Sequence, residues 1–188
     1  MPCLPPSGFR NAERGRSVVC LRTTRQPVPC VHARGELGLE FVPQQPTHMC
    51  LAVYVAADAP LPESRWNEHA PSFYLESIPE SAGVRRQFRH AHVYYAGSHE
   101  GCGCGFFKRG RDGEELEQRQ QNYRALASVL APRVGAGADI QLFTCWEGDL
   151  MARPETTEVI TLPQLLDPGF ELRPLSLITV CPDARGCA

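Results

Sequence analysis

The segment Gly97–Phe106, which reads GSHEGCGCGF, constrains this chain more than any other stretch. It places two thiols, a histidine and a carboxylate among four glycines. A connection that only reversed the chain direction would not need cysteines spaced by glycines. Glycine lets the backbone adopt conformations that other residues avoid, and it lets N–H groups approach a ligand closely. We therefore expect the loop 97–105 to be the functional part of the protein.

Apolar patterns on both sides of this loop predict the fold. Runs of β-favouring apolar residues predict strands over 50–56, 72–78, 92–96, 140–146, 158–161 and 175–180. Between the third and fourth runs, apolar residues recur at helical spacing and predict a helix over about 113–131, started by an Asp112–Glu115 capping box and ended by Pro132 and Gly135. The sequence thus predicts an α/β (or α+β) fold, a single small domain with a mixed sheet of about five to six strands and one main amphipathic helix.

Residues 1–48 differ from the rest of the chain. They hold seven prolines and six arginines against three glutamates, with no sustained period of a strand or helix. Such a segment buries too little apolar surface to offset the entropy of ordering it. We interpret 1–48 as a disordered leader, or as a stretch translated from a start codon set too early, and 49–188 as the domain. A basic arm or a transit peptide is the alternative.

The composition indicates which partners the protein is not expected to bind and which cellular compartment suits its cysteines. The net charge is −2, and without the basic leader the remainder carries about −5, which favours neither nucleic acid nor an anionic membrane. No run approaches the ~18 apolar residues of a membrane span. Nine cysteines without a signal peptide predict free thiols in a reducing cytoplasm. Lys108 is the only lysine among 19 basic residues, a bias typical of GC-rich bacterial genomes.

The order strand, helix, strand around the loop predicts a parallel crossover, if both strands share a sheet. The carboxyl ends of 92–96 and 140–146 would then lie at one edge, where open α/β sheets place ligands. We therefore expect Cys145 to lie beside the loop. An antiparallel arrangement would put it at the far end.

A metal site is the first hypothesis for the chemistry of this edge. Cysteines two residues apart on an extended backbone point the same way, with attachment points about 6.5–7 Å apart, so they can converge on one soft ion. Cys102, Cys104 and Cys145, with His99 or His92, would complete the four nitrogen and sulfur ligands of a closed zinc site. Cys-x-Cys is not the usual zinc knuckle, in which two to four residues separate the cysteines.

Thiol chemistry is the second hypothesis. Cys104 would be the nucleophile or redox centre, His99 its base and Cys102 the resolving thiol. A non-enzymatic interaction module with a structural loop is the alternative from another class. A third interpretation is a glycine-rich cradle for an anion, although the glycine spacing fits neither G-x-x-x-x-G-K-[ST] nor G-x-G-x-x-G. The opening Met49-Cys50 before an apolar strand is similar to N-terminal-nucleophile amidotransferases, which implies Cys50 as a nucleophile, although the later motifs of that family are not apparent.

Overall fold

Strand β1 (Leu51–Ala57) is the centre of the domain, since all seven of its residues are buried. The computed structural model describes residues 50–182, and the leader predicted over 1–48 lies outside the described residues. Five further strands form one sheet with β1, in the order β2-β3-β1-β4-β6-β5. They are β2 (Tyr74–Ser77), β3 (His92–Gly97), β4 (Ile140–Trp146), β5 (Thr156–Thr161) and β6 (Ser176–Cys181).

The sheet is mixed. β1 pairs antiparallel with both β3 and β4, β2 with β3, and β4 with β6, whereas β5 and β6 are parallel. The helices are α1 (Gly113–Gly135) and the short α2 (Leu162–Leu165), with 3-10 turns η1 (Gly83–Gln87), η2 (Gly103–Phe106) and η3 (Glu147–Asp149). The predicted fold, a small domain with one mixed sheet and one main helix, is confirmed, and its form is α+β.

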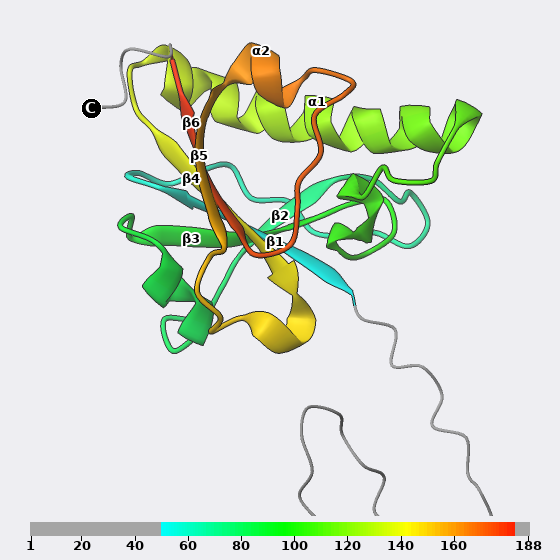
Figure 1. Cartoon of the computed structure of the whole chain (residues 1–188). Helices are drawn as coiled ribbons and strands as arrows, with labels where there is room; N and C mark the ends of the chain where they lie inside the picture. The colour runs from blue at the N-terminus through cyan, green and yellow to red at the C-terminus, as the bar shows by residue number, and fades with distance from the viewer. Residues whose placement is uncertain (1–49, 183–188) are drawn as a thin grey trace, which may run out of the picture. The chain divides into compact units, whose positions relative to one another are not determined.

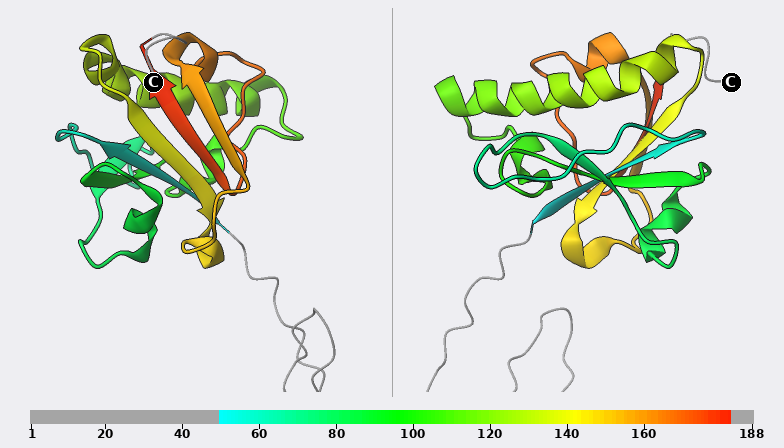
Figure 2. Two further views of the ribbon diagram at one scale, coloured as in Figure 1. Left: turned by 60° about the vertical axis from the view of Figure 1, so that its left-hand side comes forward. Right: turned by 180° about the vertical axis from the view of Figure 1, so that it is seen from behind.

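Two apolar layers cover the two faces of the sheet. The larger lies under α1 and α2 and contains Leu51, Val53 and Val55 of β1 with Leu126 and Leu130 of α1. The smaller lies on the opposite face, around Phe143, under the segment that carries η1. Figures 1 and 2 show α1 crossing one face of the sheet while η1 and η3 lie on the other. No helix in the described part of the chain is long and apolar enough to cross a membrane.

The ends of α1 differ from the prediction. Asp112 is the residue before the helix, but its side chain makes no capping hydrogen bond, and Glu115 pairs with Arg111 instead. The helix also continues through Pro132 to Gly135. It ends in a Schellman motif, in which the N–H groups of Gly137 and Ala138 donate to the carbonyls of Val134 and Arg133. Gly137 has a φ of +89°, which glycine adopts without strain.

The prediction that the strands before and after α1 are parallel and end at one edge of the sheet is confirmed. Because β3 and β4 both run antiparallel to β1, they are parallel to each other, with β1 between them. The carboxyl ends of β3 and β4 and the amino end of β1 therefore share one edge of the sheet. The loop after β3 reaches this edge, and so does the residue that precedes β1, Cys50.

Candidate metal centre

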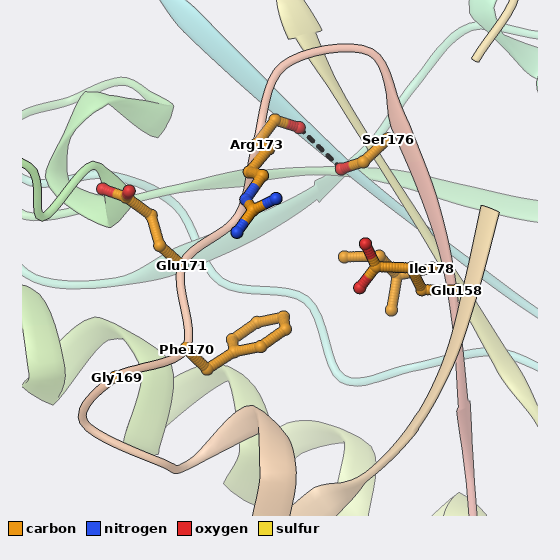
Figure 3. A pocket seen from close by; sticks show the side chains of 7 residues that line it. All are labelled: Glu158, Gly169, Phe170, Glu171, Arg173, Ser176 and Ile178. Atoms are coloured by element: carbon orange, nitrogen blue, oxygen red, sulfur yellow. Dashed lines mark hydrogen bonds between the residues drawn. The ribbon is translucent and has the colours of Figure 1, made fainter. Parts of the chain in front are cut away.

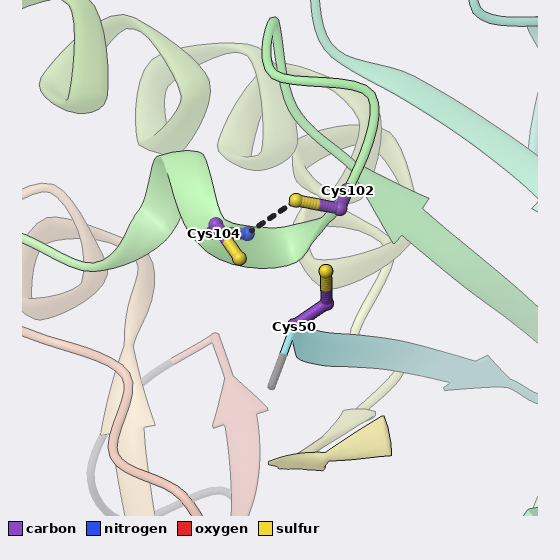
Figure 4. A group of neighbouring side chains, drawn as sticks. All are labelled: Cys50, Cys102 and Cys104. Atoms are coloured by element: carbon purple, nitrogen blue, oxygen red, sulfur yellow. Dashed lines mark hydrogen bonds between the residues drawn. The ribbon is translucent and has the colours of Figure 1, made fainter. Parts of the chain in front are cut away.

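Three thiols meet at this edge. The Sγ atoms of Cys50, Cys102 and Cys104 all lie within 4.8 Å of one another, close enough to hold a metal ion. Figure 4 shows Cys50 at the start of β1, facing the two loop cysteines. All three side chains are half-buried, so the group is reachable from solvent. Cys50 is the residue that sequence reasoning missed as a ligand, because it belongs to a segment about fifty residues upstream.

Backbone N–H groups point at two of the three sulfurs. The N–H of Leu51 donates to Cys104 Sγ at 3.3 Å, and the N–H of Cys104 donates to Cys102 Sγ at 3.4 Å. Such donors stabilise a thiolate more than a thiol, because a hydrogen bond to a charged acceptor is stronger. The loop and the start of β1 thus each supply partial positive charge where thiolates would form.

Polar side chains hold the loop in this shape. Ser98 is fully buried; its hydroxyl donates to Cys102 O at 2.6 Å and accepts the N–H of Gly105 at 3.1 Å. Arg119 of α1 is also buried, and its guanidinium donates to Cys104 O at 2.6 Å and to the Glu100 carboxylate at 2.8 Å. The loop is therefore fixed to the helix as well as to the sheet.

Gly103 lets the loop approach β1. A Cβ atom at this position would lie 2.5 Å from Leu51 O, a backbone atom that cannot move without shifting the central strand. The N–H of Gly103 donates to the Tyr95 hydroxyl at 3.2 Å. The alternation of glycine with cysteine thus has a steric cause: the residue between the two thiols lies against the main chain of β1.

Burial raises the pKa of two of these thiols. The pKa of Cys102 is raised to about 12, mainly because its surroundings solvate a thiolate poorly. The pKa of Cys50 is raised by burial first and then by the charge of a Cys104 thiolate and of the Glu147 carboxylate. A cation among the sulfurs would oppose these effects, because it neutralises the thiolates.

Cys145 is not a member of the group. It is fully buried on β4, paired with Ala52, and belongs to the small apolar layer on the face away from α1. Cys104 packs against the larger layer on the α1 face. The two strand ends meet as expected, but alternation along β4 turns the Cys145 thiol to the other face. Burial raises its pKa to about 12.

His99 faces a different neighbour. The ring atom Nδ1 of His99 lies 2.9 Å from Asn122 Nδ2. Asn122 Nδ2 also donates to Gly105 O at 2.8 Å, and Asn122 Oδ1 accepts the backbone N–H of His99. Flipping the Asn122 amide would break these other bonds, so His99 Nδ1 is an acceptor and the neutral ring carries its proton on Nε2. Nε2 lies 3.9 Å from Glu100. His99 is not part of the thiol group, and neither is His92, which lies at the opposite end of β3.

Two recesses lie away from the thiols. His99 and Asn122 line a cleft of about 600 Å³ between α1 and the segment 71–73. A recess of about 100 Å³ lies beside β5 and β6, where Glu158 and Arg173 are among the lining residues (Figure 3). The second is too small for an organic ligand. Neither is lined by Cys50, Cys102 or Cys104.

No protein-family model matches the chain, and neither the curated proteins nor the solved structures include a significant match. The similarity of Met49-Cys50 to N-terminal-nucleophile amidotransferases gains no support from these comparisons.

Replacing Gly103 with alanine tests the close approach of the loop to β1. We expect Gly103→Ala to lower the free energy of unfolding by about 1–3 kcal/mol, because the new methyl group overlaps Leu51 O. Gly135→Ala is the matched control, since no atom beyond its chain neighbours and its own helix backbone lies within 4 Å of its Cβ position, and alanine favours a helix. Urea denaturation of both variants measures the difference. Equal stability of Gly103→Ala and the wild type would contradict the close contact.

The pH dependence of stability tests the burial of Cys145. Its pKa is raised from 9.0 to about 12 by folding, so the native state holds the proton more strongly than the unfolded chain and loses stability as pH rises through this window. One such thiol lowers the free energy of unfolding by up to about 1.4 kcal/mol per pH unit. In metal-free protein we expect the wild type to lose stability more steeply than Cys145→Ala between pH 9.0 and about 12. Parallel curves would show that this thiol is not buried.

Proposed function

We propose that this protein binds one soft metal ion, of the class of zinc, through the thiolates of Cys50, Cys102 and Cys104. The observation that carries the proposal is the mutual approach of these three sulfurs to within 4.8 Å. Zinc–sulfur bonds of about 2.3 Å place two sulfurs of a tetrahedral ion about 3.8 Å apart. The thiols therefore need only a small inward movement to share an ion.

The chemistry of the donor set supports a soft ion. Thiolates select zinc, copper(I) and iron–sulfur clusters over magnesium and calcium, which prefer oxygen. The N–H groups of Leu51 and Cys104 are already directed at sulfur, and metal-bound thiolates need such partners. The surrounding loop is held by buried Ser98 and Arg119, so little further ordering is needed when the ion binds.

Thiol catalysis by Cys104, with Cys102 and His99, has weaker support. The Nδ1 atom of His99 accepts a hydrogen bond from Asn122, and the imidazole lines a cleft that none of the three thiols lines. Cys102, the expected resolving thiol, has its pKa raised to about 12, which disfavours the reactive thiolate.

Cys50, Cys102, Cys104 and Cys145 are free thiols as predicted, whereas Cys181 is disulfide-bonded. A location in a reducing cytoplasm therefore stays a prediction.

Zinc content of single variants tests the proposal. We expect about one zinc per chain in the purified wild type, because thiolate sites bind zinc tightly enough to retain the ion through purification. Cys50→Ser, Cys102→Ser and Cys104→Ser should each weaken zinc binding by at least about 100-fold, because losing only a hydrogen-bond partner of a metal ligand already costs about 10- to 100-fold. The readout is elemental analysis together with competition against a chromogenic chelator.

Cys145→Ser is the matched control, because this thiol is buried on the other face of the sheet. It should keep the zinc content of the wild type. Folded wild-type protein that takes up no zinc would overturn the proposal. So would a Cys50→Ser variant that binds zinc as the wild type does, since Cys50 brings the third thiolate.

A further inference from the structure

The thiol group provides three ligands and, within the described part of the chain, no fourth. No histidine, aspartate, glutamate or further cysteine between residues 50 and 182 joins Cys50, Cys102 and Cys104 within 4.8 Å. A closed tetrahedral zinc site needs four protein ligands, and a site with three leaves a position for water or substrate. The number of donors in the site thus suits an ion whose coordination is complete with three sulfurs.

The charge around the thiols also distinguishes between ions. Three thiolates with a divalent ion leave a net charge of −1, and with a trivalent ion they leave none. Glu147, directly after β4, has its N–H bonded to Cys50 O at 3.0 Å, and its exposed carboxylate acts on the Cys50 thiol through its negative charge. Arg119 of α1, the buried cation that contacts the loop, is already paired with Glu100. Burying uncompensated charge is costly, so a neutral complex suits these half-buried sulfurs best.

From these two observations we infer that the site takes trivalent arsenic, in the form of arsenous acid, through all three thiols. The inference rests on the proposed soft-ion site and names a class of ligand for it. Arsenous acid is small and uncharged at neutral pH, so it can reach half-buried sulfurs beside Glu147 without electrostatic repulsion. Antimony(III) shares this chemistry.

The binding step is a condensation that balances without a redox partner. Three As–O bonds and the S–H bonds of Cys50, Cys102 and Cys104 break, while three As–S bonds form. Each hydroxide leaves with one thiol proton as water, so three waters are released. Arsenic stays trivalent, no electrons are transferred, and its lone pair occupies the position that a fourth ligand would take in a zinc site.

A comparison of two arsenicals tests the inference on the zinc-free chain. Arsenous acid takes three thiols, whereas phenylarsine oxide has a phenyl group on arsenic and takes two. We expect Cys50→Ser, Cys102→Ser and Cys104→Ser each to weaken the binding of arsenous acid by at least about 100-fold. Losing only a hydrogen-bond partner of a ligand already costs up to about that factor in affinity. Phenylarsine oxide should still bind each variant, which also shows that the variant is folded. Cys145→Ser should bind both as the wild type does.

X-ray absorption at the arsenic edge gives the decisive count. Three sulfurs and no oxygen around arsenic would support the inference. Two sulfurs and one oxygen, or unchanged arsenous acid affinity in any of the three variants, would overturn it. Zinc is titrated separately into the same chain. Zinc binding without arsenous acid binding overturns only the inference, whereas arsenous acid bound by three sulfurs without zinc binding supports the inference and overturns the zinc proposal.

Discussion

The contact between the loop after β3 and the first residue of β1 is the constraint on which the site depends. Leu51 makes both halves of this contact: its N–H donates to Cys104 Sγ, and its carbonyl oxygen leaves room only for a glycine at 103. Because β1 is the buried central strand, its position is set by packing on both faces. The thiol of Cys50 is therefore held in place by the same interactions that stabilise the sheet, while Ser98 and Arg119 hold the loop that faces it.

Local sequence patterns predicted the elements well. Every strand and the main helix lie where apolar runs and helical spacing indicated, and the crossover from β3 to β4 brings both strand ends to one edge. The ends of α1 were harder to predict, because Gly137 ends the helix through backbone hydrogen bonds that Pro132 does not prevent. The prediction that the Asp112 side chain caps the helix was also wrong, because a capping pattern in the sequence does not guarantee that the hydrogen bond forms.

The identity of the third thiol could not be read from local sequence, for two physical reasons. Strand order depends on long-range packing, and no local pattern places β1 between β3 and β4. The buried strands also carry no alternation: β1 is buried throughout and β4 nearly so, so a run such as that around Cys145 does not reveal which side chains face α1. Once β1 is placed antiparallel between β3 and β4, its first end, with Cys50, must lie at their carboxyl ends, but that placement comes from the structure and not from the sequence.

X-ray absorption at the zinc edge of the zinc-loaded protein, compared with zinc-loaded Cys50→Ser, tests the central claim most directly. We expect three sulfur ligands at about 2.3 Å from zinc in the wild type and two in the variant. An unchanged sulfur count in Cys50→Ser, or a wild-type ion bound mainly by oxygen and nitrogen, would contradict it.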